Sequence, residues 1–461
     1  MSSVLSPLNA ISPIDGRYWR KVSSLSDFSS EASLFKHRVW VEVEYLIALS
    51  ESAAFRARVP DMLQLDAAEK TAMRQLYTQF GADECARVKE LERSTNHDIK
   101  AVEYFLKERF DAVPRWAPHK EWLHFALTSQ DINNTALPLM LYGALDHVLV
   151  PALAATVDQL RRLGVLWLDV PMLARTHGQP ATPTRVGKEL LVFVERLARQ
   201  MRMLAAVPRC CKFGGATGTF GAHHVAMPDV DWCALADELC ARLGLERLQY
   251  TTQIEHYDMM AATFDALARI NTILIDLARD VWQYISLGYF TQAVVAGEVG
   301  SSAMPHKVNP IDFENAEGNC GLANSLFRHM AEKLPISRLQ RDLSDSTVLR
   351  NIGVPLSHTL LALQSLQAGL AKLSLNRAAL AADLDGNWQV LSEAIQTILR
   401  RERYTAPYEA LKALTRGASA ADAPRLLREF VGQLQVSDSV RAELLALTPA
   451  TFIGTMPKAL P

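Results

Sequence analysis

The side chains of this sequence that could carry out chemistry gather in five polar, turn-rich segments. Hydroxyl, imidazole, carboxamide, ammonium and guanidinium groups dominate them, and such groups bind small anions and move protons. A Gly-x-Ser-x-Gly elbow is absent from the sequence, so a serine-hydrolase triad is not indicated. The five segments are Ser94–Asp98, Thr128–Asp131, Arg175–Pro183, Gly297–Asn315 and Gln340–Arg350.

The first two segments stand directly before apolar-periodic stretches, where helices are expected to begin. Residues 94–96, Ser-Thr-Asn, are types that cap helix amides, and His97 beside such a terminus is expected to be a neutral donor that faces an anion. Thr128 and Asp131 have the spacing of a capping box. A capped helix terminus also binds carboxylates, so the structural and the binding interpretations are compatible.

The third and fourth segments are rich in glycine and proline, which predicts irregular loops. In the third, Thr, Gln and Gly flank His177 and could orient its ring while a ligand approaches. In the fourth, paired serines at 301 and 302 stand near Lys307 and Asn309, as in the mobile lid of an active site. The simpler alternatives are a solvated histidine and a flexible surface loop.

The fifth segment offers charged donors for one phosphate group. Arg341, Ser346 and Arg350 could surround a phosphate with charge-assisted hydrogen bonds. Taken alone, however, the segment is better explained as a solvated, salt-bridged surface.

Long amphipathic helices are the elements expected to position these segments. Residues 257–287 contain neither Gly nor Pro, and their apolar residues recur at steps of three and four, which predicts a helix of roughly 45 Å. Similar patterns cover 142–168, which Pro151 interrupts, and 186–207. Strand signals are sparse, and no strand–glycine turn–helix unit is present, which disfavours dinucleotide folds and P-loops. The sequence therefore predicts an all-α fold.

The length of 461 residues exceeds one compact core and predicts several domains. Proline and loop positions favour three helical domains. These are an N-terminal domain at 1–118, a central long-helix bundle at 119–370 and a C-terminal domain at 371–461. A helix as long as 257–287 is expected to pack in a long bundle or across subunits.

The composition argues against several classes of protein. The net charge is −2, and no block of Lys or Arg stands out, so no nucleic-acid partner is expected. The six cysteines form no Cys-x-x-Cys pair and no zinc-finger spacing, so no metal site is expected. A signal peptide and an uninterrupted apolar run of about 18 residues are both absent, so we expect a cytoplasmic protein without a membrane span.

The fourth segment resembles a known signature. Gly300–Pro310, Gly-Ser-Ser-Ala-Met-Pro-His-Lys-Val-Asn-Pro, is similar to the signature loop of the fumarase/aspartase superfamily, and His306 points toward its adenylosuccinate lyase or cycloisomerase branches. Further stretches resemble the adenylosuccinate lyase family, in the order expected for it. They are 12–18, 95–98, 128–129, 175–183, 251–255 and 346–350. One departure is the turn Gly-Ala-Thr-Gly at 215–218, where the superfamily commonly has Val in place of Thr217.

The resemblance implies a β-elimination that releases fumarate from adenylosuccinate and from a succinylated aminoimidazole carboxamide ribotide, without metal or cofactor. It implies Ser301 as the general base and His177 as the general acid, with His97, Lys307 and Glu314 also in the catalytic set. It also implies a homotetramer in which His97, His177 and Ser301 come from three different chains. The implied substrate-binding residues are Arg17, Tyr18, Asn96, His97, Asp98, Thr128, Ser129, Gln253, Ser302, Lys307, Val308, Asn309, Asn315, Arg341, Ser346, Thr347, Val348, Leu349 and Arg350.

Two alternatives remain at this point. Another lyase of the superfamily, such as argininosuccinate lyase or a cycloisomerase, would share the lid but would not need the phosphate donors of 341–350. A crystallin-like scaffold could keep the fold while losing Ser301 or His177, and both residues are present.

Overall fold

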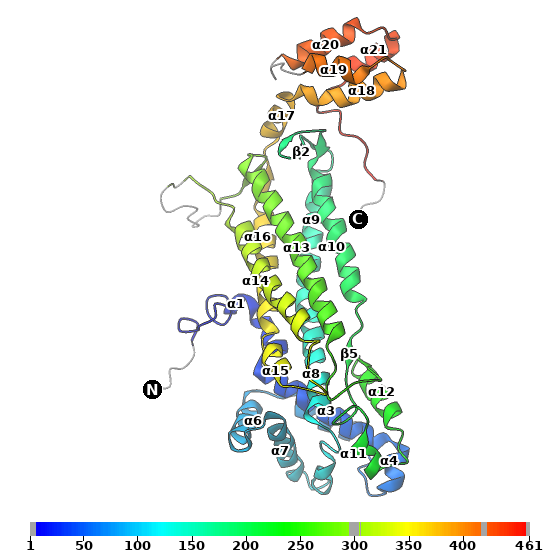
Figure 1. The fold of residues 1–461 in the computed structure, drawn as a ribbon. Helices are drawn as coiled ribbons and strands as arrows, with labels where there is room; N and C mark the ends of the chain where they lie inside the picture. The colour runs from blue at the N-terminus through cyan, green and yellow to red at the C-terminus, as the bar shows by residue number, and fades with distance from the viewer. Residues whose placement is uncertain (1–5, 295–303, 305, 416–421, 458–461) are drawn as a thin grey trace. The chain divides into compact units, whose positions relative to one another are not determined.

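Helices account for nearly all of the regular structure. The computed structural model describes residues 6–294, 304, 306–415 and 422–457. Across these residues the strands are two or three residues long and pair only two at a time (Figure 1). The predicted all-α fold is therefore confirmed.

The chain divides into two compact units, and each is built from three separate stretches of sequence. Unit 1 comprises Met1–Leu153, Gln200–Thr272 and Gly318–Leu363, and unit 2 comprises Ala154–Arg199, Ile273–Glu317 and Gln364–Pro461. Five long helices contribute residues to both units: α9 (Val150–Leu166), α10 (Val186–Ala205), α13 (Asp258–Ser286), α14 (Ile311–Lys333) and α16 (Gly353–Ala371). The three-domain division at 118/119 and 370/371 is a different one and stays a prediction.

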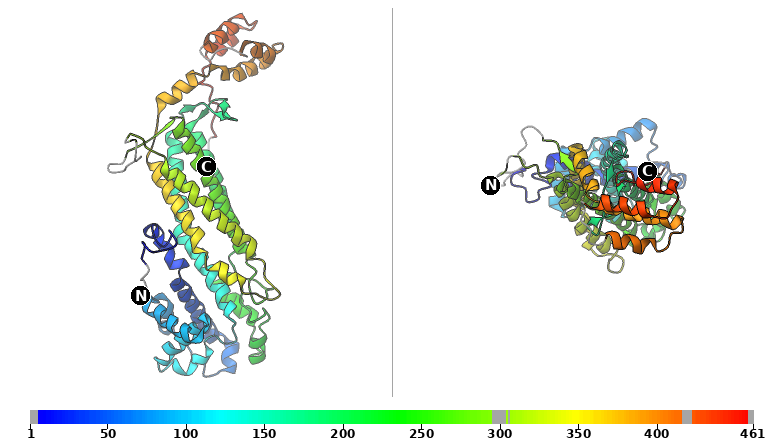
Figure 2. Two further views of the ribbon diagram at one scale, coloured as in Figure 1. Left: turned by 60° about the vertical axis from the view of Figure 1, so that its left-hand side comes forward. Right: turned by 90° about the horizontal axis from the view of Figure 1, so that it is seen from above.

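The five long helices lie side by side as a bundle in the views of Figures 1 and 2. The longest, α13, has 29 residues and a length of about 43 Å, within a residue or two of the stretch predicted from its apolar periodicity. A buried side-chain hydrogen bond joins α13 to α16, since Asn271 Nδ2 donates to Thr359 Oγ1 at 3.0 Å. Helices α9 and α10 approach so closely that a Cβ added at Gly187 would lie 2.1 Å from the carbonyl oxygen of Gly164.

A continuous helical run leads into the bundle. It begins with α8 (Ser129–Ala144), changes to π-helical geometry at Leu145–Leu149 and continues as α9, so the helix is irregular just before Pro151. The run Ser129–Leu166 is long and apolar enough to cross a membrane by length and composition alone. Because 56% of its most apolar window is buried within the chain, it is equally explained as a core helix.

Unit 1 is organised around α3 (Glu31–Glu51), a helix whose side chains are buried on almost every side. Such an element cannot show a simple two-faced pattern, because neighbours cover it all around. Helices α5 and α8 pack on it, and α6 packs on α7. The other elements of unit 1 are α1 (Trp19–Val22), α2 (Ser26–Ser29), α4 (Ala53–Arg58), α5 (Ala67–Thr78), α6 (Ala82–Thr95), α7 (Asp98–Asp111), β5 (Cys210–Cys211), α11 (Gly221–Ala226), α12 (Trp232–Arg242), β6 (Glu246–Arg247) and α15 (Ser344–Leu349), with 3₁₀ turns at Ser23–Leu25 and Ala117–Trp122.

Unit 2 carries three small antiparallel strand pairs and the C-terminal helices. The pairs are β1 (Pro171–Met172) with β4 (Thr184–Arg185), β2 (Arg175–Thr176) with β3 (Gln179–Pro180), and β7 (Phe290–Gln292) with β8 (Leu373–Leu375). The C-terminal helices share an apolar core that includes Ile395, Leu399 and Leu427. They are α18 (Ser392–Arg401), α19 (Pro407–Thr415), α20 (Ala423–Gln433) and α21 (Asp438–Leu445), with a 3₁₀ turn at Trp388–Leu391. Helix α17 (Arg377–Asp385) precedes them, and its Leu384 belongs to a separate buried cluster with Leu173 and Val390.

Candidate functional site

His97 occupies the start of α7 and is itself the residue that caps this helix. Asn96 ends α6 in the left-handed conformation, with φ of 51°, and the chain turns there. The amide of Lys100 donates to His97 Nδ1 at 3.2 Å, so the sequence-based expectation that residues 94–96 would cap the helix is wrong. Because Nδ1 accepts a hydrogen bond, the neutral ring carries its proton on Nε2. The ring is half exposed, so that proton is accessible from solvent, and the anion-facing role of His97 stays a prediction.

Asp98, the next residue, is held by a buried arginine from α3. Arg38 Nη2 donates to Asp98 Oδ2 at 2.8 Å, and Arg38 Nε donates to Asn133 Oδ1 at 3.0 Å. Arg350 Nη2 lies 3.7 Å from the same Asp98 oxygen. Burial by itself would raise the pKa of Asp98, but the charge and hydrogen bond of Arg38, with a smaller contribution from Arg350, lower it below its ordinary value. The carboxylate is therefore ionised and shared by two arginines.

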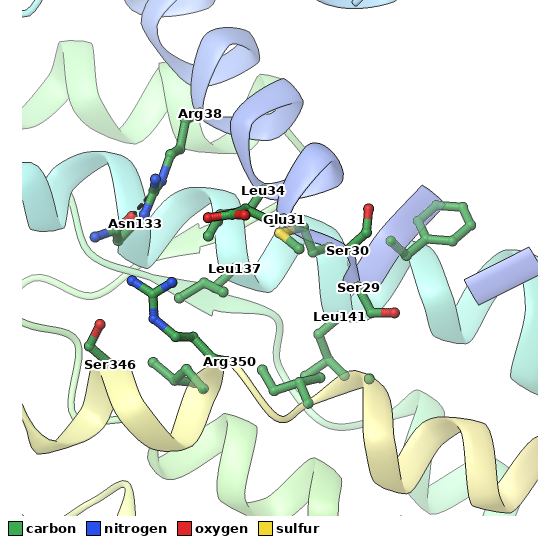
Figure 3. Close-up of a pocket in the computed structure, with 15 residues that line it drawn as sticks. Ser29, Ser30, Glu31, Leu34, Arg38, Asn133, Leu137, Leu141, Ser346 and Arg350 are labelled. Atoms are coloured by element: carbon green, nitrogen blue, oxygen red, sulfur yellow. Dashed lines mark hydrogen bonds between the residues drawn. The ribbon is translucent and has the colours of Figure 1, made fainter. Parts of the chain in front are cut away.

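A cavity of about 290 Å³ lies next to this cluster, within unit 1. Figure 3 shows the guanidinium groups of Arg38 and Arg350 turned toward each other from opposite walls, with Asn133 beside them. Ser346 adds a hydroxyl at the same polar end. The rest of the wall is mainly apolar and includes Leu34, Leu137 and Leu141. The cavity thus joins two cations and a hydroxyl to an apolar surface, a combination that suits an anion with an apolar body.

Thr128 and Ser129 begin α8. The predicted capping interaction is present on one side, since Thr128 N donates to Asp131 Oδ2 at 2.8 Å. Asp131 in turn sends its own amide to the carbonyl of Thr128 at 2.9 Å. Both hydroxyl residues are partly exposed, so they are accessible at the helix terminus where a carboxylate would bind.

The same Asp131 anchors a glycine-rich turn. Its Oδ1 accepts from Lys212 Nζ at 2.6 Å and from the amides of Gly214 and Gly215 at 2.8 and 3.0 Å. The Asp131 and Lys212 side chains are both 0% exposed. One buried carboxylate therefore fixes the position of the Thr128 terminus relative to the turn.

The Gly-Ala-Thr-Gly turn at 215–218 needs its last glycine. Gly218 has φ of +77°, and a Cβ there would lie 2.3 Å from the carbonyl oxygen of Thr251. The departure at Thr217 has a local explanation, because its hydroxyl lies 3.2 Å from that of Thr219 on the exposed side. Thr217 does not disturb the contact at Gly218.

Gln253 and Arg341 meet although 88 residues separate them. Arg341 Nη1 donates to Gln253 Oε1 at 3.2 Å, and Gln253 N donates to the carbonyl of Gln340 at 3.3 Å. Gln253 Nε2 also donates to the carbonyl of Ala216 at 3.2 Å. The carboxamide therefore joins the Arg341 segment to the glycine-rich turn. Arg341 Nε is buried and has no hydrogen-bond partner among the described residues.

A buried network positions Ser346. The amide of Ser346 donates to Asp345 Oδ1 at 2.7 Å, and Tyr257 OH donates to Asp345 Oδ2 at 2.8 Å. Asn134 Nδ2 donates to Tyr257 OH at 2.7 Å and Asn134 Oδ1 accepts from Glu255 N at 2.8 Å. Burial raises the pKa of Glu255 to about 7, and the nearby charge of Asp258 acts in the same direction.

The remaining predicted residues of unit 1 differ in exposure. Arg350 and Thr347 are exposed, Val348 is partly exposed, and Leu349 is buried in the cavity wall. Arg17 is exposed just before α1, with its guanidinium 6.0 Å from the ring centre of Tyr18.

His177 lies at the tip of a hairpin in unit 2. The prediction of an irregular loop at 175–183 is wrong, because β2 and β3 pair antiparallel around a two-residue turn. His177 and Gly178 both have positive φ, 53° and 75°, as a tight hairpin turn of this kind requires. Arg175 Nη2 pairs with Asp383 at 2.7 Å and fixes the hairpin to α17. The exposed imidazole therefore projects from a braced support.

The lid segment is described only in part. Ser301 and Ser302 lie outside the described residues. Lys307 and Val308 are exposed, Asn309 is partly exposed, and Gln292 Nε2 donates to the carbonyl of Val308 at 3.3 Å. These three residues precede the first turn of α14.

Glu314 is in that first turn, and Asn315 follows it directly. Glu314 Oε1 accepts from Trp282 Nε1 at 3.0 Å, and Asn315 Oδ1 accepts from Ser365 Oγ at 2.7 Å. Each therefore has a defined orientation at the start of the helix.

Sequence reasoning missed Arg38, Lys212 and Tyr257 as supports of the site, and it assigned Asp131 only a capping role. A charged residue within the apolar stretch around Arg38 was the available signal. Over the described residues, no three His, Cys, Asp or Glu side chains converge as metal ligands.

Known proteins resemble this chain along nearly its whole length. A family described as lyase matches residues 16–323, and a family described as adenylosuccinate lyase C-terminal matches residues 337–453. The adenylosuccinate lyase of Dictyostelium discoideum is 53% identical over 463 residues, which cover 98% of each chain. That of Escherichia coli K12 is 49% identical over 454 residues, which cover 98% of this chain and 97% of the relative.

Two solved structures share the fold. The fumarate lyase from Mesorhizobium sp. BNC1 has a TM-score of 0.71 at 19% identity and covers 94% of this chain and 95% of its own. The 3-carboxy-cis,cis-muconate lactonizing enzyme from Pseudomonas putida has a TM-score of 0.69 at 20% identity, with 95% of both chains covered. At these identities they support the fold alone, whereas the family matches and the close relatives identify the chain as an enzyme of the C–N lyase class. The chain belongs to the adenylosuccinate lyase family.

Proposed function

We propose that this enzyme releases fumarate from adenylosuccinate, giving AMP, and from the succinylated aminoimidazole carboxamide ribotide, giving the carboxamide ribotide. In both reactions a base removes a proton from the carbon next to a carboxylate. The electron pair forms the new C=C bond, the C–N bond breaks at the neighbouring carbon, and the leaving nitrogen takes up a proton. The carbanion-like transition state needs fixed donors and positive charge around the carboxylates.

The acid and the base are Ser301 and His177 in this proposal. Ser301 is the general base, and Lys307 with the backbone amides of the lid stabilises its alkoxide once water is excluded. His177 is the general acid, and its exposed place on a braced hairpin supports a role in proton transfer to the leaving nitrogen. Glu314 and His97 complete the catalytic set, His97 as a neutral donor.

The nucleotide phosphate binds to donors of unit 1 in this proposal. The observation that carries it is the hydrogen bond between Gln253 and Arg341. Arg341 belongs to the same short stretch of sequence as Arg350, whose guanidinium lies near Asp98. Tyr18 and Arg17 join this group of donors. The succinyl carboxylates bind to Thr128, Ser129, Ser302, Lys307 and Asn309. The remaining predicted residues surround the substrate, and they are Asn96, Val308, Asn315, Thr347, Val348 and Leu349.

A different lyase of the superfamily is the rival. An argininosuccinate lyase or a cycloisomerase would have no use for three phosphate donors. Arg341, Ser346 and Arg350 lie within ten residues of one another in the sequence, and hydrogen bonds to Gln253 and Asp345 hold the first two in place. Three donors in one such segment favour a nucleotide substrate.

The decisive experiment supplies adenylosuccinate to the purified enzyme and follows the release of fumarate. Turnover is expected without added metal or cofactor, and addition of a chelator is the control. Turnover of argininosuccinate with no release of fumarate from adenylosuccinate would contradict the proposal. Activity that a chelator abolishes and a divalent ion restores would contradict its cofactor-free part.

We further propose a cytoplasmic homotetramer in which three chains build each site. Inactive His177→Ala and inactive Ser301→Ala enzymes are mixed, dissociated and reassociated. About a quarter of the sites in random hybrids then receive both native residues, and activity returns in that proportion. If tagged co-purification shows hybrids that stay inactive, each chain carries its own complete site.

A further inference from the structure

Arg38 is a charged side chain in an unusual place. Its residue is only 3% exposed, within a helix whose neighbouring side chains are buried as well. Nη2 and Nε have partners in Asp98 and Asn133, while Nη1 is buried and has no hydrogen-bond partner among the described residues. Burying a guanidinium is costly, and a methionine of similar length would fill the space. A role beyond packing is therefore worth seeking.

Two arginine side chains lie near the carboxylate of Asp98. Arg38 Nη2 contacts Oδ2 at 2.8 Å, while Arg350 Nη2 stays 3.7 Å from the same oxygen, outside hydrogen-bond distance. The two arginines differ in freedom, because the Arg38 side chain is 3% exposed and the Arg350 side chain is 57% exposed. Arg38 is fixed on Asp98, and Arg350 remains free to turn toward a ligand in the adjoining cavity (Figure 3).

We infer that Arg38 is a positioning residue for nucleotide binding, which occupies the Asp98 carboxylate and thereby keeps Arg350 available to the phosphate. The inference rests on the proposed function. Without Arg38, the Asp98 carboxylate would have no cation bound to it and would attract Arg350 from 3.7 Å into a full ion pair. The N–H donors of Arg350 would then bind Asp98 instead of the phosphate. The net charge of the three groups would also fall from +1 to 0, since Arg38 and Arg350 outnumber Asp98.

Arg38→Met tests this inference, and Arg38→Lys is the conservative variant. The expected result for Arg38→Met is a KM for adenylosuccinate raised about 10-fold or more, the loss typical of a hydrogen bond to a charged group, with kcat little changed. Lysine keeps the charge on Asp98 but lacks the second contact with Asn133, so a smaller rise is expected. Inhibition by inorganic phosphate should weaken in parallel.

Arg247→Met is the matched control. Arg247 is also buried, at 6% exposure, and pairs with Asp237 at 2.7 Å. Its other side-chain hydrogen bonds among the described residues go to the carbonyls of Phe213 and Leu248 and to Gln249, none of which is a predicted substrate residue. It should lower the melting temperature without raising KM. Equal KM increases in Arg38→Met and Arg247→Met would reduce Arg38 to a structural role and overturn the inference.

A double-mutant cycle with Asp98→Asn separates a positional from a general effect. In the Asp98→Asn background there is no carboxylate to capture Arg350, so Arg38→Met should no longer raise KM further. If it raises KM by the same factor in both backgrounds, the inference fails. If Arg38→Met does not fold, an unchanged KM in Arg38→Lys overturns the inference. The double variant Arg38→Met/Asp98→Asn, which buries neither charge, can still be compared with Asp98→Asn.

Titration with AMP keeps this test independent of the reaction. A wild-type enzyme that binds AMP but releases no fumarate would defeat the proposed function alone. Wild type and Arg38→Met that bind AMP equally would defeat the inference alone.

Discussion

Asp131 and Lys212 form an ion pair that is closed off from solvent, and replacing Asp131 with Asn tests its contribution. Both side chains are 0% exposed and 2.6 Å apart. The carboxylate also accepts from Thr128 N, Gly214 N and Gly215 N, so asparagine would weaken four interactions and place an amide against a donor. Removal of one partner from a buried pair destabilises a protein by about 3–5 kcal/mol.

The stability lost in Asp131→Asn depends on pH, and the direction of that dependence can be predicted. Burial lowers the pKa of Lys212 below its ordinary value, and Asp131 opposes that effect in the wild type. Without Asp131 the pKa falls further, and the folded state binds the lysine proton more weakly than the unfolded state does. The loss of stability is then full below the folded pKa and shrinks as the pH rises toward the unfolded pKa near 10.

Urea denaturation at one fixed protein concentration measures the difference. Asp146→Asn is the control, because Asp146 pairs with Arg209 while both side chains are 42% exposed, and exposed pairs contribute about 0–1 kcal/mol. An Asp131→Asn enzyme that loses no more stability than Asp146→Asn would refute the reasoning. So would a loss that is as large at pH 10 as at pH 7.

Three further outcomes are expected. Glu255→Gln should be more stable than wild type at pH 8 by up to about 3 kcal/mol and equally stable near pH 4. The raised pKa of about 7 means that wild type loses stability as the pH rises and Glu255 ionises, whereas glutamine does not ionise. Urea midpoints at both pH values check this. Gly218→Ala should lower the melting temperature more than Gly244→Ala, since both glycines have φ of +77° but only the first would bring a Cβ within 2.3 Å of the Thr251 carbonyl. Arg341→Ala should raise the KM for adenylosuccinate by roughly 10-fold or more with little change in kcat, and an unchanged KM at low substrate would remove it from the phosphate site.

The parts of this structure that depend on local sequence were predictable. Helix α13 follows from apolar residues at steps of three and four, and the Thr128–Asp131 interaction follows from capping-box spacing. The hairpin at His177 was missed for a local reason as well. Asn-Gly is the usual sequence signal for a two-residue hairpin turn, and here His-Gly occupies the two positions of positive φ. This turn is recognised only when the pairing of β2 with β3 is known.

The contacts that support the site depend on tertiary packing and could not be predicted. Gln253 meets Arg341 across 88 residues, and Arg38 meets Asp98 across 60. Periodicity indicates that a helix is buried but does not say which distant carboxylate a buried arginine will meet. For the same reason, the apolar stretch around Arg38 indicates that this arginine could be buried, but it does not identify Asp98 as its partner.

Three of the predicted site residues lie where helices begin, and such places suit the anionic groups of a succinylated nucleotide. His97 caps α7, Thr128 caps α8, and Asn309 lies two residues before α14. The amides at helix starts lack partners within the helix and carry positive partial charge. A substrate with two carboxylates and a phosphate needs several such places at once. A bundle of long helices provides them without a block of basic residues, which accords with the near-neutral charge of the chain.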